Sequence, residues 1–283
     1  MDARTKLLES QIKGGKKELL SSVASARKNI EAKIIKYAER GDFIKAATVR
    51  DGLYRGIAEE YVKLNAGVDD WTKKQSTKTA KAWHALAVDD LPSGAKATTF
   101  GQFSEKYLDD IVGKINPTTI GDRVAMSPRI EGMLSEDVRA IRTAVTETIR
   151  EGALTGMSNR ELTAEMIKKA TAIKPTAQFI DKAGRTWNSE SYFGMLNRTL
   201  HANVARETYA DTVVEAGFDL MRVEGGVSTG EADDPCNQYV DAILSMTGAT
   251  PGYPTVAEAT ANGLFHPNCV HSLSVVDPDE VKK

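Results

Sequence analysis

Both cysteines of the chain and two of its four histidines lie close together near the C-terminal end. They follow one another as Cys236, His266, Cys269 and His271. Thiolate and imidazole groups are the usual ligands of tetrahedral structural zinc, and Cys and His residues separated by a hairpin-sized insert are typical of such sites. The spacing therefore predicts a structural zinc ion on these four side chains.

Other interpretations of the same residues stay open. Cys236 and Cys269 could be ordinary buried thiols, with His266 hydrogen-bonded to the backbone of its loop. In an oxidising compartment the two cysteines could instead form one disulfide bond, which the sequence favours less than a metal site.

Metal ions held by His and Cys can also catalyse reactions, because an open coordination position activates water. A zinc deaminase would need a His or Cys ligand followed two residues later by Glu, and then a Pro-Cys-x-x-Cys sequence. The chain has neither pattern. Asn268, inside the His-containing loop, keeps a metal-dependent nuclease as the alternative function. The residues favour a protein that is not an enzyme.

Length and composition indicate one or two soluble domains, because 283 residues with 27% charged and 41% hydrophobic side chains can form a sizeable core. No apolar run approaches the roughly 20 residues needed to cross a bilayer. The first residues contain Lys and Arg but no apolar signal core. We therefore expect no membrane segment and no secretion.

Charge is distributed unevenly along the chain. Residues 1–81 contain 18 Lys and Arg against 11 Asp and Glu, a net charge of +7; the remaining residues contain 19 against 28, a net charge of −9. A basic arm of this kind is expected to contact nucleic acid or an acidic protein surface. The alternative is a solvated helix, since the arm also carries many acids and lacks the interleaved Arg and aromatic residues of a dedicated nucleic-acid binder.

Apolar residues at helical spacing predict long helices over residues 3–87, interrupted at Gly41-Asp42. The first stripe consists of Leu19, Val23, Ala26, Ile30, Ile34 and Tyr37. No heptad pattern is sustained, so we expect a helical hairpin or bundle rather than a long coiled coil. His84 is predicted to be a packing or surface residue rather than a metal ligand.

The middle of the chain alternates between linkers and helices. Pro and Gly predict linkers over 91–99 and 116–128, on either side of one short helix at 100–114. A helical pattern then runs from Ser135 to Gly152. Ser158 and Glu161 form a capping-box pattern for a helix that extends toward Ala172 and stops before Pro175.

The C-terminal part is predicted to mix helices and strands. A polar turn at 181–187 leads into a helix on which Arg198 is expected to tie neighbouring groups together, and the role of His201 stays open. Three strands are predicted at 218–224, 242–246 and 272–276, with a short helix at 256–262 that Thr255 caps. Such a small sheet with a helix across it would bring Cys236 close to the 266–271 loop.

The predicted fold class is therefore α+β and predominantly α, with a helical N-terminal region and a small mixed C-terminal module that contains the Cys/His cluster. Three regions are expected: residues 1–90 as a basic helical arm or hairpin, 91–175 as a linker with middle helices, and 176–283 as the α+β module.

The C-terminal third closely resembles the phage minor capsid protein 2 family and is similar to the minor head proteins typified by phage Mu. The resemblance covers roughly residues 180–276; the first 170 residues match only in being helical. Its upstream part consists of Asp181, Gly184, Arg185, Trp187, Tyr192, Met195, Arg198 and Thr199. Its downstream part consists of Cys236, Ile243-Leu244-Ser245, Thr247-Gly248, Gly252-Tyr253-Pro254, the run from Gly263 to Cys269, and His271.

This resemblance implies a low-copy structural protein of a tailed-phage head, assembled in the host cytoplasm and located in the virion. Its implied partners are the portal protein and the major capsid protein. Viral DNA would be contacted through the basic arm during packaging or ejection. The resemblance brings no catalytic residue. Family members usually have a Cys pair before the His-Pro-Asn-Cys loop, whereas here Asp233 replaces the first Cys and Val270 replaces a basic residue. Against the family pattern, Cys236, His266, Cys269 and His271 can still complete a tetrahedron, and the carboxylate of Asp233 is the alternative ligand.

Overall fold

The computed structural model contains two compact units, each assembled from segments that are far apart in the sequence. The Cys/His unit comprises Met1–Lys16, Trp71–Pro117 and Gly194–Lys283, and the bundle unit comprises Lys17–Asp70 and Thr118–Phe193. The predicted boundaries near residues 90 and 175 stay a prediction about independently folding domains. The structure describes residues 3–40, 47–115, 119–120, 123–124, 128–180, 184, 186–225, 234–266, 269 and 271–277.

Helices α1 (Ala3–Ala38) and α2 (Ala47–Asp90) each contribute residues to both units. The predicted break at Gly41-Asp42 falls between them, among residues 41–46 outside the described set. Within the Cys/His unit, Trp83 Nε1 donates to Gln11 Oε1 at 3.1 Å. Within the bundle unit, Asn29 Nδ2 donates to Glu60 Oε2 at 3.0 Å. These pairs place the two helices antiparallel.

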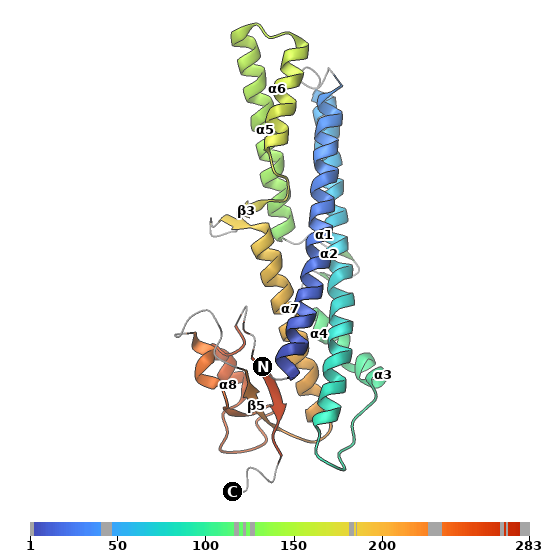
Figure 1. Cartoon of the computed structure of the whole chain (residues 1–283), viewed down its shortest axis with the longest axis vertical. Coiled ribbons are helices and arrows are strands. Elements are labelled where there is room, and N and C mark those ends of the chain that lie inside the picture. The colour runs from blue at the N-terminus through green and yellow to red at the C-terminus, as the bar shows by residue number, and fades with distance from the viewer. Residues whose placement is uncertain are drawn as a thin grey trace. The chain divides into compact units, whose positions relative to one another are not determined.

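The bundle unit adds the helical hairpin of α5 (Pro128–Thr155) and α6 (Asn159–Ala172) (Figure 1). The predicted capping box is present, because Ser158 N donates to Glu161 Oε2 at 2.7 Å and Glu161 N donates to Ser158 Oγ. Helix α5 starts before the predicted Ser135, since proline is well tolerated in the first turn of a helix. The buried core confirms most of the predicted stripe; it contains Leu19, Val23, Ala26, Ile30, Ile34, Leu53, Ile57, Tyr61, Leu64, Ile141, Val145 and Met166.

Two hairpins in this unit were not predicted. Strand β1 (Thr119–Ile120) pairs antiparallel with β2 (Arg123–Val124), and β3 (Gln178–Ile180) pairs antiparallel with β4 (Thr186–Asn188). Strands of two or three residues are too short to produce a recognisable alternation of apolar and polar residues.

The Cys/His unit contains the mixed part of the fold. The predicted short helix at 100–114 is present as a continuous run of α3 (Phe100–Phe103), the π-helical turn η1 (Ser104–Leu108) and α4 (Asp109–Ile115). Helix α7 (Ser189–Glu215) begins in the bundle unit and mostly belongs to this one. His84 is buried against the rings of Phe100 and Phe103, which confirms its predicted packing role.

The sheet has the strand order β6-β5-β7 and is antiparallel throughout. Its strands are β5 (Leu220–Glu224), β6 (Ile243–Ser245) and β7 (Ser272–Val275), close to the three predicted ones. Between β6 and β7 lies α8 (Val256–Ala261), which Thr255 and Glu258 cap with a capping box (Figure 1). The α+β, predominantly α fold class is confirmed.

The core of the Cys/His unit joins both ends of the chain. Leu8 of α1 and Trp83 of α2 belong to the same buried apolar cluster as Tyr209 of α7, Met221 of β5 and Cys236. Polar contacts follow the same path: Arg4 forms an ion pair with Asp90, Tyr209 Oη donates to Asp90 Oδ2 at 2.8 Å, and the Val275 amide donates to Tyr209 Oη at 3.1 Å. The N-terminal turns of α1 therefore stabilise the C-terminal sheet.

Among the described helices, none is both long enough and apolar enough to cross a lipid bilayer.

Candidate metal centre

Two short segments of the Cys/His unit position the candidate ligands. Cys236 lies on the 3-10 helix η2 (Pro235–Tyr239), and His266 follows α8 through a turn in which Gly263 and Phe265 both have positive φ, at 101° and 60°. A Cβ at position 263 would lie 2.7 Å from Pro235 Cβ, so only glycine allows the turn to approach η2 this closely.

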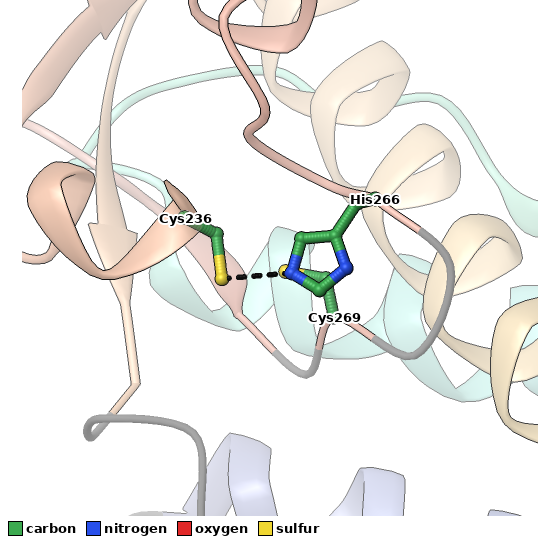
Figure 2. Close-up of side chains that lie close together, drawn as sticks. All are labelled: Cys236, His266 and Cys269. Carbon is green, nitrogen blue, oxygen red and sulfur yellow. Dashed lines mark hydrogen bonds between the residues drawn. The ribbon is translucent and has the colours of Figure 1, made fainter. Parts of the chain in front are cut away.

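Three of the four predicted ligands come together. The donor atoms of Cys236, His266 and Cys269 all lie within 4.8 Å of one another, and His266 Nε2 is 3.1 Å from Cys236 Sγ (Figure 2). Both cysteines are free and buried, with 0% and 2% of their surface exposed. The arrangement is a compact set of soft donors that can hold a metal ion.

The fourth predicted ligand, His271, is fully buried, and its Nδ1 lies 3.3 Å from Cys269 Sγ without joining the group of three. Asp233, the predicted alternative ligand, and Asn268, the basis of the nuclease alternative, lie outside the described residues. The neighbouring Asp234 was not predicted, yet its Oδ1 lies 2.9 Å from His266 Nε2. In the sequence, only the adjacency of Asp233 and Asp234 indicated this contact.

Burial controls the protonation of the cluster. Loss of solvent, followed by the proximity of Cys269, raises the pKa of the Cys236 thiol to about 12. Without a metal ion this thiol is therefore protonated at neutral pH. Because a metal binds the thiolate, binding must release a proton, and we expect metal affinity to rise with pH.

Arg206 of α7 contacts the loop that carries Cys269 and His271. It was not predicted, because it lies far from these residues in the sequence. Its Nη1 donates to the carbonyl oxygens of Cys269 at 3.4 Å and His271 at 3.1 Å, and Nη2 donates to Asn203 Oδ1. The guanidinium lies 4.4 Å from the centre of the Phe265 ring. Burial lowers the pKa of Arg206 to about 10, so it stays charged at neutral pH.

A second polar centre lies at the hydroxyl residues at the end of β6 and in the turn that follows it. The Asp219 carboxylate accepts hydrogen bonds from the side chains of Ser245, Thr247 and Thr250 and from the amides of the two threonines, at 2.6–3.1 Å. Although burial opposes the effect, these donors hold the pKa of Asp219 well below its usual range. The residues from Ser245 to Thr250 therefore form a turn built around one carboxylate.

The remaining residues singled out in the sequence have local structural surroundings. The rings of Trp187 and Tyr192 meet edge to face at 6.5 Å, Gly184 has a φ of 77°, Arg198 is exposed, and Arg185 lies outside the described residues. His201 is buried, with Nδ1 2.7 Å from Thr79 Oγ1. Burial, assisted by Lys78, lowers the pKa of His201 to about 4, so this side chain is neutral at pH 7.

Comparison with known proteins gives one match. A family model described as Phage minor capsid protein 2 matches residues 57–279, most of the chain. The match begins within α2, so the likeness extends well beyond the motifs at residues 180–276 and includes helices in which no motif was visible. No match to the chain was found among curated proteins or among solved structures.

Proposed function

Because the chain belongs to the phage minor capsid protein 2 family, we propose that it is a structural component of a tailed-phage head that contacts the portal protein and the major capsid protein during assembly. The family match across residues 57–279 is the observation that carries this proposal. A non-enzymatic role is part of it. The description of the matching family as a minor capsid protein supports that role.

The assembly role is tested by co-expressing the chain with the portal protein alone, with the major capsid protein alone, and with both. We expect the chain to sediment with particles that contain the portal, and to be present in purified virions. Recovery only in the soluble fraction, with none in particles or virions, would overturn the proposal.

We also propose that Cys236, His266 and Cys269, together with a fourth donor, hold one structural zinc ion. Soft thiolates and an imidazole fit zinc, and a closed site of this kind offsets the entropy lost when loops become ordered. When bound, the ion would supply a cross-link between η2 and the loop before β7. It would supply no reactive group.

Elemental analysis of protein purified without chelator or a metal-affinity tag tests the zinc proposal. We expect about one zinc ion per chain in the natural protein and none in the Cys236→Ser/Cys269→Ser variant. The matched control is Ser272→Ala, which alters a buried residue next to the loop without removing a candidate ligand. Absence of metal from both the natural protein and the control would show that the cluster is a packed pair of thiols.

One further observation favours contact with DNA. The α2 segment from residue 71 to 88 contains four lysines and no Asp or Glu. Lys73, Lys74, Lys78 and Lys81 are all exposed, whereas Trp71 and Trp83 in the same stretch of the helix are buried. This lysine stripe spans roughly 12 Å at about 1.5 Å per residue. A row of cations of this length fits a nucleic-acid backbone, and we propose it as the DNA-contacting surface of the basic arm.

The salt dependence of DNA binding tests the lysine stripe. Changing Lys74, Lys78 and Lys81 to Gln should weaken binding of the chain to duplex DNA and reduce the slope of log K against log salt by about 2 to 3. The control changes Lys17, Lys28 and Lys36 to Gln, three exposed lysines on α1. Equal loss in both variants would show that only net charge matters, and the stripe would then have no specific role.

A further inference from the structure

We infer that the fourth ligand of the proposed metal site is the carboxylate of Asp234 and that His271 supports the site from outside the coordination sphere. This inference rests on the proposed structural zinc, and it names a ligand that neither the motif nor the family likeness indicates.

The first argument is the position of the carboxylate. Asp234 Oδ1 lies 2.9 Å and Cys236 Sγ lies 3.1 Å from the same atom, His266 Nε2. A metal-bound histidine has its coordinating nitrogen on the ion and donates from its other nitrogen to an outer carboxylate. Here the carboxylate and the thiol converge on one nitrogen, as ligands of a shared ion do. Two ligand atoms on a tetrahedral zinc ion lie about 3.3 to 3.7 Å apart. Asp234 is not in the group of donors that all lie within 4.8 Å of one another, so its carboxylate must turn from His266 toward the two sulfurs to complete a tetrahedron.

The second argument is that the Asp234 side chain can move, whereas the His271 ring is held in place. The Asp234 side chain is 22% exposed and lies just before η2, so its carboxylate can turn toward the cluster. His271 is fully buried, and its carbonyl oxygen accepts from Arg206. Its ring also lies close to Gly225, where a Cβ would be 3.2 Å from His271 Cδ2. With the ring held in place, Nδ1 is suited to donating to the Cys269 sulfur at 3.3 Å.

The third argument is charge. A zinc ion with two thiolates and two neutral imidazoles has no net charge, whereas replacing one imidazole by a carboxylate makes the site singly negative. Arg206 is only 6% exposed and carries a positive charge directly behind the loop. The acidic groups that act on it are Cys269, Glu207 and Cys236, and Glu207 is partly exposed to solvent. A carboxylate ligand would therefore place a further negative charge beside this buried cation, which a second neutral imidazole would not.

Zinc affinity and the cobalt spectrum of four variants test the assignment. Asp234→Ala should lower zinc affinity, measured by competition with a chelator, at least tenfold more than His271→Asn does, because loss of a ligand costs more than the 10–100-fold typical of an outer-shell residue. Asp233→Ala is the neighbouring control and should change affinity by less than about threefold. Far-UV circular dichroism checks that each variant is folded.

The variant Asp234→Cys should strengthen the cobalt absorption, which a substitution outside the coordination sphere could not do. With cobalt in place of zinc, its sulfur-to-metal absorption should increase by about half over the natural protein, as expected for three thiolates in place of two. An unchanged spectrum in Asp234→Cys, with a changed one in His271→Asn or Asp233→Ala, would assign the fourth ligand to that residue and overturn the inference. If the natural protein binds neither metal, the zinc proposal fails as well, so the two failures are distinguishable.

Discussion

The bundle unit and the Cys/His unit use different kinds of core. In the bundle unit, apolar stripes such as Leu19 to Ile34 meet along long helices, and a regular spacing in the sequence specifies most of the packing. In the Cys/His unit, helices, a three-stranded sheet and short loops share a core that contains two thiols and a guanidinium. The comparison shows that regular helices require little beyond periodicity, whereas a loop-rich core depends on individual polar contacts.

Buried polar groups show the same difference. The described part of the bundle unit has a polar centre in which Tyr61 Oη donates to Asp137 Oδ2 at 2.5 Å and the Thr176 amide donates to the same oxygen at 3.1 Å. The Cys/His unit buries Asn197, His201, Arg206 and His271, all 6% exposed or less. Substitutions of these buried groups should therefore change the free energy of unfolding by different amounts in the two units.

The largest effect is expected at Arg206. The change Arg206→Met removes the donors to the carbonyl oxygens of Cys269 and His271 and leaves both buried without those partners, which should lower the free energy of unfolding by about 2–4 kcal/mol. Chemical denaturation monitored by tryptophan fluorescence measures this change. Arg198→Met, at an exposed arginine of the same helix, is the control and should cost less than about 0.5 kcal/mol. Similar losses in the two variants would mean that Arg206 contributes no more than a surface arginine.

A smaller effect is expected at the paired glycines of α1. A Cβ at Gly15 would overlap Asn197 Oδ1 and His201 Nε2, whereas a Cβ at Gly14 would meet no atom within 4 Å. Asn197 Nδ2 is held by the Ile12 carbonyl oxygen, so the site cannot relax freely. Gly15→Ala should therefore lower the free energy of unfolding by about 1–2 kcal/mol, because the added methyl group overpacks the site.

The adjacent Gly14→Ala should instead raise the free energy of unfolding by about 0.5–1 kcal/mol, because alanine has the higher helix propensity. Thermal unfolding followed by circular dichroism compares the two. Stabilisation by both substitutions would show that α1 does not pack tightly against α7 at this point in the Cys/His unit.

An effect comparable to that of Gly15→Ala concerns pH in the bundle unit. Burial raises the pKa of Asp137 to about 6, above its value in the unfolded chain, although the Tyr61 and Thr176 donors act in the opposite direction. The folded state therefore binds the proton more strongly, and stability should increase as the pH falls from about 7 to 4, by on the order of 1–2 kcal/mol. Asp137→Asn should remove this increase. Denaturation at several pH values measures it, and an equal pH dependence in the variant would exclude Asp137 as its source.

The fold could be predicted from the sequence wherever hydrophobic periodicity or a capping residue was enough to define an element. The helices α1, α2 and α6, the capping box at Ser158, the cap at Thr255 and the three strands of the sheet all followed from periodicity and capping residues. The short hairpins were missed, because strands of two or three residues leave no pattern.

The candidate site was predicted in part. Cys236, His266 and Cys269 were recognisable because thiols and imidazoles are rare and were closely spaced. Arg206 and Asp219 were not, since arginine and aspartate are common surface residues and only the fold brings them to the loops that they hold. The packing of α1 into the same core could not be predicted either, because an apolar stripe on a helix does not show which element it packs against.

The central claim is that the Cys/His unit is one cooperative body built from three segments of the chain. Hydrogen exchange measured by mass spectrometry, with and without a chelator, tests it most directly. We predict that removal of metal lowers protection together in residues 3–16, 71–115 and 194–277, while residues 17–38, 47–70 and 128–172 keep theirs. Loss confined to residues 194–277 would contradict the claim and support an independent C-terminal domain.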